Sequence, residues 1–412
     1  MQLAQSSISI TESRKVTLSY LFYTFFKIGC VSFGGYMALV SLVQKIMVDT
    51  DETVDNEVII DGITVATLIP GPVAVNIVAY IGYHLKGKTG AAISMLAVLL
   101  PACSMMLFLA WAYFSYAYKF EWTQAMYYVV AAVSAIILST GVNLYKKEIG
   151  KNYKKALLCL FAIVVMSITN SYIIILAFIL LGAVAGLLLE GNTYNSVFKP
   201  VDLKNQAKFG LTPAYCLLIG LFAVNEFLFI SNIFKNFSSP LLKIIIAFSG
   251  ISLSLFGGGY VMIPLMQTLF VNNLHWLSTQ QFIDAIAFSQ ATPGPILVSA
   301  TFIGYKLAGI TGAIIGTIGM FAPSAVLMIV VSKLFKKTKD HTLVKDMVAG
   351  IKVVVIGLII ASAIRILYQQ PFSIGLIMVA LVALILSFKF KVSPVYLIIG
   401  SITIGILTKY LI

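Results

Sequence analysis

A set of glycines and prolines occurs twice in this sequence, in the same order and at nearly the same spacing. The first copy comprises Phe33, Gly34, Gly35, Tyr36, Asp61, Pro70, Gly71, Pro72, Gly82, Tyr83, Gly90, Ala91 and Pro101. The second copy comprises Phe256, Gly257, Gly258, Gly259, Tyr260, Asp284, Pro293, Gly294, Pro295, Gly304, Tyr305, Gly312, Ala313 and Pro323. Matching positions are separated by 222 to 224 residues throughout. Because chance matches do not keep such a register, the sequence indicates an internal duplication.

The composition indicates that the duplicated chain is a membrane protein. Of its 412 residues, 60% are hydrophobic and 10% are charged, whereas a soluble domain carries about a quarter charged residues. The apolar stretch at residues 16–47 is too long, and too often interrupted by glycine and lysine, to be the short core of a signal peptide. We therefore expect it to remain in the mature protein as part of the first membrane segment.

A helix needs about 20 apolar residues to cross the hydrocarbon core of a bilayer, and on that rule we predict about 13 transmembrane segments in an all-α, polytopic fold. They lie near residues 16–46, 58–83, 89–117, 124–144, 155–168, 171–189, 211–232, 244–270, 281–304, 309–332, 347–367, 372–388 and 393–411. The pair 155–168 and 171–189 has two interpretations, because its first member is short and the turn between them is uncharged. It forms either two full crossings or a hairpin that does not fully cross.

The basic residues are distributed unevenly between the predicted loops. When the N-terminus is placed in the cytoplasm, the inner loops contain 19 Lys and Arg residues and the outer loops contain six. This asymmetry follows the positive-inside rule, and it accounts for the net charge of +13 without a nucleic-acid partner. We predict a multi-pass protein of the plasma membrane, with its N-terminus inside and its C-terminus outside.

Each copy of the repeat holds six predicted segments, and one unpaired segment at residues 211–232 lies between the copies. An additional crossing turns the second copy upside down, so we predict two inverted-topology repeats with discontinuous helices. The predicted units are an N-terminal repeat at residues 1–210, a linking transmembrane helix within residues 211–243 and a C-terminal repeat at residues 244–412.

The two Pro-Gly-Pro triplets are expected to interrupt helices inside the membrane. Proline removes a backbone donor and disfavours helix in the residue before it, so each triplet should end one helix and start another. A half-helix that starts there presents unpaired N–H groups and the positive end of its dipole, which favours an anion. The candidate substrate-binding residues belong to these breaks, to the glycine motifs or to nearby polar and cationic positions: Lys27, Phe33, Gly34, Gly35, Pro70, Gly71, Pro72, Asn76, Phe256, Gly257, Gly258, Gly259, Gln290, Pro293, Gly294, Pro295 and Arg365.

Charged residues at membrane depth are further candidates. Lys27, Lys352 and Arg365 lie within apolar segments, where a charge usually marks a substrate path or a paired partner. Lys352 and Arg365 have a second interpretation, in which the long side chain extends to the membrane interface. Asp61 and Asp284 occupy matching positions nine residues before the first proline of each triplet. They are candidates for proton coupling, because burial favours the neutral form of a carboxyl group.

The glycines outside the breaks have a structural interpretation. Glycines in membrane helices are more often contacts between helices than ligand sites. We therefore expect tight turns and close helix packing at Gly82 and Gly90, and at the matching Gly304 and Gly312.

The remaining sequence features argue against an enzyme, a metal site or a cofactor. The four cysteines lie far apart, with no Cys-x-x-Cys pair and no histidine at ligand spacing. The sequence contains no His-Glu-x-x-His motif, nucleophile elbow or ATP-binding P-loop. We therefore predict a transporter that has no catalytic activity and draws on an ion gradient.

The duplicated motifs resemble those of the chromate transporter family, in its long two-domain form. The family's Phe-Gly-Gly-Gly motif maps onto residues 256–259 in full, and onto residues 33–35 with Tyr36 in place of the third glycine. Its Gln-x-x-Pro-Gly-Pro pattern is similar to the segment that starts at Gln290, whereas the first half has Thr67 in place of the glutamine. The likeness covers nearly the whole chain, and the second half keeps more of the family pattern.

The resemblance implies secondary active export of chromate, a tetrahedral dianion close to sulfate in shape. The two breaks would meet near the membrane midplane, with the halves rocking around the bound anion. Two alternatives stay open: an anion channel that uses the same helix ends, and a transporter of a different small anionic metabolite. The expected partners are the oxyanion, chromate or sulfate, and the lipid bilayer, while a homodimer is an assembly that the sequence leaves open.

Overall fold

The computed structural model describes residues 16–32, 36–116, 122–169, 171–189, 239–256, 259–335, 342–371 and 373–411. Every regular element within these ranges is helical, as the sequence predicts. The predicted crossing segment at residues 211–232 lies outside the described residues, so its existence stays a prediction.

The helices occur in two series with the same order. The first series comprises α1 (Leu18–Val31), α2 (Tyr36–Val43), the π-helix η1 (Gln44–Thr50), α3 (Asn56–Leu68), α4 (Val73–Tyr116), α5 (Trp122–Glu148), α6 (Tyr153–Ile168) and α7 (Tyr172–Leu189). The second series comprises α12 (Pro240–Leu253), the 3-10 helix η2 (Gly259–Val261), α13 (Met262–Met266), the π-helix η3 (Gln267–Asn273), α14 (Thr279–Ala291), the 3-10 helix η4 (Ile296–Val298), α15 (Ser299–Phe335), α16 (Thr342–Tyr368), α17 (Ile374–Phe388) and α18 (Pro394–Leu411). The duplication in the sequence is therefore also a repetition of secondary structure.

The long helices α4 and α15 are each interrupted by a kink. Gly87 in α4 and Gly309 in α15 lie at the kinks with φ of 61° and 59°, a conformation that favours glycine. A Cβ atom added at Gly90 would lie 2.2 Å from the carbonyl oxygen of Gly82, so the two arms of α4 pack directly on each other. The matching glycines of α15 make the same contact. The predicted turns and close packing at these glycines are confirmed.

The described helices are those of a membrane protein. The stretches that are long and apolar enough to cross a bilayer are Val73–Tyr116, Met126–Glu148, Ile296–Ser332 and Asp346–Tyr368. Shorter apolar helices, among them α1, α12 and α17, accompany them. Large apolar side chains such as Phe161 on α6, Met378 on α17 and Ile399 on α18 are more than half exposed, and an outer surface of this kind suits lipid. The count of 13 segments stays a prediction.

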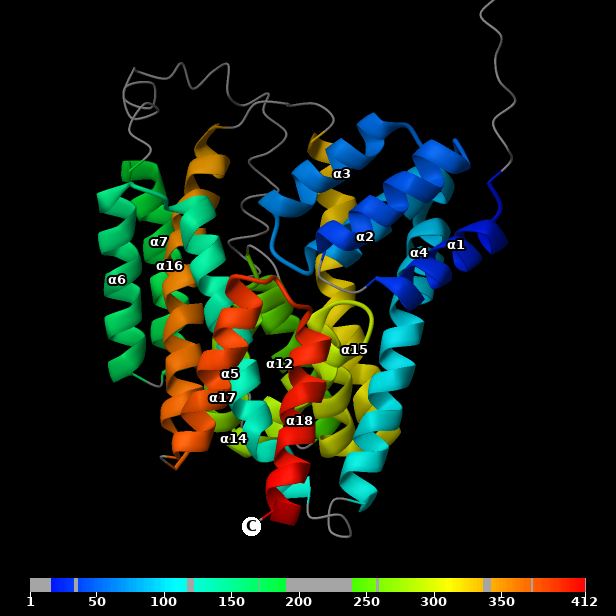
Figure 1. The fold of residues 1–412 in the computed structure, drawn as a ribbon. Helices are drawn as coiled ribbons and strands as arrows, with labels where there is room; N and C mark the ends of the chain where they lie inside the picture. The colour runs from blue at the N-terminus through cyan, green and yellow to red at the C-terminus, as the bar shows by residue number, and fades with distance from the viewer. Residues whose placement is uncertain are drawn as a thin grey trace, which may run out of the picture.

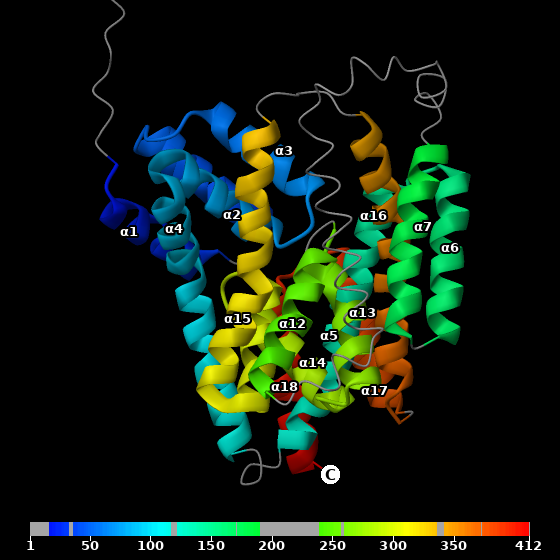
Figure 2. The same cartoon turned by 180° about the vertical axis from the view of Figure 1, so that it is seen from behind.

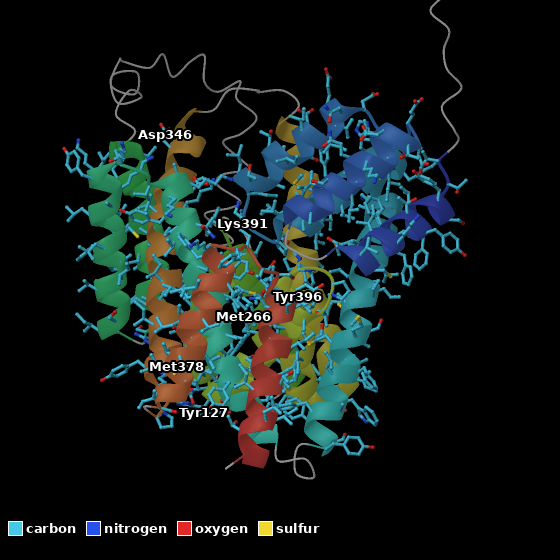
Figure 3. The ribbon with its side chains drawn as sticks, viewed as in Figure 1. Tyr127, Met266, Asp346, Met378, Lys391 and Tyr396 are labelled. Atoms are coloured by element: carbon cyan, nitrogen blue, oxygen red, sulfur yellow. The ribbon has the colours of Figure 1, made fainter. Side chains whose placement is uncertain are left out.

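The first helices of the two series lie toward opposite ends of the molecule. Figure 1 shows α1, α2 and α3 at its upper end, and α12 and α14 in its lower part. Between them α4 and α15 pack side by side, as both views show (Figures 1 and 2). On the other side α5 and α16 pack on each other, and α6, α7, α17 and α18 pack against this pair. Figure 3 places Asp346 of α16 at the upper end and Met378 of α17 toward the lower end.

Candidate substrate site at the helix breaks

The chain leaves helical conformation at both Pro-Gly-Pro triplets. Gly71 lies between the end of α3 and the start of α4, with a φ of 125°. Gly294 lies between α14 and η4, with a φ of 108°. A residue with a side chain rarely adopts such values, so the centre of each triplet is a glycine for a conformational reason. The predicted helix breaks at the two triplets are confirmed.

Each break is hydrogen-bonded to the other half of the chain. The backbone N–H of Gly71 donates to the carbonyl oxygen of Leu255 at 2.7 Å. The backbone N–H of Gly294 donates to the carbonyl oxygen of Ser32 at 2.8 Å. Both acceptors directly precede a Phe-Gly-Gly motif, and they occupy matching positions in the duplication. The triplet of one half is therefore joined to the glycine motif of the other half, in both directions.

The breaks also pack against the long helices of the opposite halves. A Cβ atom added at Gly71 would lie 2.2 Å from the Cβ of Ser324 in α15. A Cβ atom added at Gly294 would lie 3.0 Å from the Cβ of Ala102 in α4. Ser324 and Ala102 each follow a proline of the duplicated set. The two triplets, the two long helices and the ends of α1 and α12 therefore form one continuous region of contact between the halves.

Buried polar groups beside the breaks lack hydrogen-bond partners among the described residues. Asn76, in the first turns of α4, is fully buried, and neither its amide nitrogen nor its amide oxygen has a partner there. Ser299, at the matching position of α15, is likewise buried with an unpaired hydroxyl. Gln290 accepts a hydrogen bond from the Tyr260 hydroxyl at 3.1 Å, while its Nε2 is unpaired. Buried polar groups are normally satisfied, so these groups are candidates for contact with a polar ligand.

A cavity of about 70 Å³ lies at the first break. Its lining comes from α3, α4, α5, α16 and the region around the second glycine motif: Thr67, Val73, Leu144, Lys147, Glu148, Phe256, Val261, Lys352, Val355 and Ile356. The Nζ of Lys352 lies 3.5 Å from Oε1 of Glu148. The cavity thus combines apolar walls with three charged side chains and the start of a half-helix.

The predicted cations Lys27 and Arg365 lie in different surroundings. Lys27 is exposed on α1. Arg365 is half-buried, and its guanidinium donates hydrogen bonds to the carbonyl oxygens of Met166 and Thr169, the latter at 3.0 Å. These carbonyls lie at the end of α6, where the last backbone acceptors of a helix need partners. The hydrogen bonds from Arg365 to the end of α6 therefore explain why this cation is half-buried, and no substrate is needed to explain it.

The matching aspartates Asp61 and Asp284 are not equivalent in the structure. Asp61 is exposed, whereas Asp284 is 1% exposed. The Tyr113 hydroxyl of α4 donates to Oδ2 of Asp284 at 2.8 Å, and Nε2 of Gln280 donates to Oδ1 at 2.8 Å. The buried carboxyl of α14 is thus linked to the long helix of the first half. Of the two coupling candidates, only Asp284 occupies an enclosed position.

Part of the predicted site lies outside the described residues. These positions are Phe33, Gly34, Gly35, Gly257 and Gly258. The third glycine of the second motif, Gly259, is described, and a Cβ atom added there would lie 2.7 Å from Cγ2 of Ile296, just after the second break. This close approach places the end of the second glycine motif beside the second triplet.

The structure adds residues that the sequence interpretation did not assign to the site, namely Lys147, Glu148, Tyr113 and Ser324. Lys147 and Glu148 lie just after a predicted segment, where charged residues are common. No sequence signal therefore distinguishes them from other charged residues in loops. Lys352 did have a signal, since it is a cation within an apolar segment.

A helical membrane protein with paired helix breaks joined across its two halves has the features of a membrane transporter. The chain matches the family model described as chromate transporter over residues 19–187 and 242–406. It therefore belongs to the chromate transporter family, which is a family of transporters and not of enzymes.

Several curated relatives cover most of the chain. It is 30% identical to a probable chromate transport protein of Synechococcus elongatus, over 90% of this chain and 90% of the relative. It is 28% identical to a chromate transport protein of Cupriavidus metallidurans, over 97% of this chain and 95% of the relative. An uncharacterized transporter of Methanocaldococcus jannaschii is 29% identical over 94% of this chain and 93% of the relative. No solved structure matches the chain.

Proposed function

We propose that this protein is a secondary active transporter that exports a small tetrahedral oxyanion, chromate in the first place and sulfate-like anions as further candidates. The observation that supports this most directly is the reciprocal pair of hydrogen bonds from Gly71 to Leu255 and from Gly294 to Ser32. Through these bonds the two halves contribute jointly to one region. The relatives named as chromate transport proteins support the choice of chromate.

The chemistry of the first break suits an anion. α4 begins at Val73, and the N–H groups of its first turn have no partner within the helix. The helix dipole adds positive potential at the same place, which stabilises an anion by up to about 2 kcal/mol in a partly buried geometry. The amide of Asn76, which has no partner among the described residues, can donate one more hydrogen bond to an oxygen atom of the substrate.

The same proposal includes two inverted-topology repeats in the plasma membrane, with the N-terminus inside. The positions of α1 to α3 and of α12 and α14, toward opposite ends of the molecule, support the inversion (Figures 1 and 2). The excess of Lys and Arg in the predicted inner loops supports the orientation. The homodimer rests on no contact in the structure and stays a prediction.

Asp284 is the residue that we propose for coupling transport to protons. It is enclosed, it contacts α4 through Tyr113, and a carboxylate is stable in such a site only when its charge is compensated. A proton supplies that compensation. Asp61 lacks the enclosure and is the weaker candidate.

The test is uptake into liposomes that contain the purified protein, with chromate, sulfate, molybdate and phosphate compared under an imposed proton gradient. We expect saturable chromate accumulation against its own gradient, with sulfate as a competitor. Flux that never saturates and runs only downhill would indicate the channel, and flux of none of the four anions would remove the oxyanion proposal.

A pair of variants separates a role in the site from a role in folding. Asn76→Ala removes an amide that has no partners among the described residues. If Asn76 has only a structural role, we expect unchanged or higher stability and normal transport. Participation in the site predicts a loss of transport with the melting temperature retained. Ser94→Ala is the matched control, because Ser94 is also buried and has no partner in the described part of the chain, but lies between the two arms of α4, beside Gly82.

A further inference from the structure

The cavity at the first break has an unusual combination of walls and charges. Six of its lining residues are aliphatic or aromatic, and three are Lys147, Glu148 and Lys352. Its volume of about 70 Å³ is several times the ~10–15 Å³ that one water molecule needs. Apolar walls lower the local dielectric constant and strengthen interactions between charges inside the cavity. Burial of a charged ligand among apolar walls is itself costly, so the three charged side chains are what make the cavity suited to a small charged ligand.

The charges of the cavity are a departure from the duplication. α5 and α16 are the corresponding helices of the two halves, and both have 27 residues. At the 223-residue spacing of the duplication, Lys352 of α16 corresponds to Val129 of α5, and Glu148 of α5 corresponds to Pro371, just after α16. Neither matching position is charged, so the Glu148–Lys352 pair distinguishes the surroundings of the first break from the duplicated pattern.

The three charges do not balance one another. Lys352 and Glu148 form an ion pair at 3.5 Å, with 28% and 26% of their side chains exposed. Lys147, next to Glu148 in sequence, adds a second positive charge to the same lining. The two lysines and the one glutamate together have a formal net charge of +1. The start of α4 at Val73 adds further positive potential.

We infer that this cavity binds the transported oxyanion through Lys147 and Lys352, and that Glu148 competes with the anion for Lys352. This inference rests on the proposed transport of an oxyanion and names the side chains that hold it. A divalent tetrahedral anion can accept hydrogen bonds from both ammonium groups at once. In this structure Glu148 contacts Lys352 at 3.5 Å, and the incoming anion takes over that contact. Glu148 thus lowers the affinity of the site and allows the anion to leave.

The competing interpretation is an ion pair that only stabilises the packing of α5 on α16. The two interpretations predict opposite signs for one substitution. If the pair is structural, Glu148→Gln and Lys352→Gln change anion binding in the same direction, because each breaks the same contact. If Glu148 competes with the anion, Glu148→Gln strengthens anion binding while Lys352→Gln weakens it.

The experiment is a titration of the purified full-length protein with chromate and sulfate at constant ionic strength. We expect Lys147→Gln and Lys352→Gln to raise the dissociation constant about tenfold or more, since each removes a charge-assisted hydrogen bond. Glu148→Gln should lower it severalfold. Lys146→Gln is the matched control and should change nothing, because the Nζ of Lys146 lies over the Phe388 ring at 4.2 Å and the residue does not line the cavity.

The outcomes distinguish this inference from the proposed function. Parent-like binding by both lysine variants, or weaker binding by Glu148→Gln, overturns the inference while chromate transport by the parent protein still stands. If the parent protein neither binds nor transports any of the oxyanions, the proposed function and the inference fall together. Lys147 is exposed near the end of α5, so Lys147→Gln provides a test even if Lys352→Gln lowers the melting temperature.

Discussion

Substitution of Gly71 by alanine tests whether the first break is as closely packed as the structure indicates. Two separate effects oppose a side chain at this position. The φ of 125° is one that residues with a Cβ atom rarely adopt. The added Cβ atom would also lie 2.2 Å from the Cβ of Ser324, well inside contact distance. Gly294→Ala is the natural comparison, since its φ is 108° but its nearest contact is 3.0 Å, to Ala102.

The magnitudes follow from these two effects. A strained backbone conformation costs about 1–3 kcal/mol, and overpacking of a buried position typically costs a further ~1–3 kcal/mol. Gly71→Ala should therefore lower stability by roughly 2–6 kcal/mol. Gly294→Ala incurs the backbone effect and only a small packing effect, so it should lower stability by about 1–3 kcal/mol.

The assay is thermal unfolding of the protein in detergent, with Ser324→Gly as a second substitution in a double-mutant cycle. Ser324→Gly removes the Cβ atom that clashes, so we expect it to recover part of the loss in Gly71→Ala. It should not recover the backbone part. Equal melting temperatures for Gly71→Ala and Gly294→Ala, together with no recovery by Ser324→Gly, would refute the packing argument.

Two further substitutions test the roles of charged residues. Asp284→Asn keeps the shape of the side chain and its contact with Tyr113, but an amide does not exchange a proton as a carboxyl group does. We therefore expect transport in liposomes to lose its pH dependence in Asp284→Asn and to keep it in the control Asp61→Asn. An unaltered pH profile in Asp284→Asn contradicts the coupling role. Arg365→Gln should lower stability by roughly 1.5–3 kcal/mol, because hydrogen bonds from a charged group to the end of α6 are lost, and should leave the dissociation constant for chromate unchanged. A higher dissociation constant with unchanged melting would instead return Arg365 to the binding site.

The helix breaks could be predicted from the sequence because their cause is local. Proline and glycine act on the backbone of their own segment, so Gly71 and Gly294 indicated the ends of helices without knowledge of the fold. What each break touches depends on residues that are distant in sequence. Ser324 and Ala102 each follow a duplicated proline, but this position does not predict contact with a triplet. The contact results from the packing of α4 on α15.

Equivalent sequence signals also led to different environments. Asp61 and Asp284 have matching positions, yet one is exposed and the other is enclosed by Tyr113 and Gln280. Duplication preserves the spacing of residues along the chain, whereas burial depends on which helices of the other half lie nearby. Lys352 and Arg365 also show that a shared sequence signal does not determine the surroundings. Both are cations in apolar segments, but Lys352 lines a cavity, whereas Arg365 of α16 donates hydrogen bonds to the end of α6.

The two backbone hydrogen bonds that join each triplet to the other half constrain the movement that transport requires. A rigid-body rocking of one half against the other around the bound anion would have to break both the Gly71–Leu255 and the Gly294–Ser32 contacts. Each broken contact leaves buried backbone groups unsatisfied, which costs about 1–3 kcal/mol unless water or substrate replaces the partner. A movement of α5 and α16 relative to intact breaks avoids this cost, and it would change the distance between Glu148 and Lys352, because these residues belong to the two moving helices. We therefore expect the breaks to stay together during transport while the charged cavity beside them opens and closes.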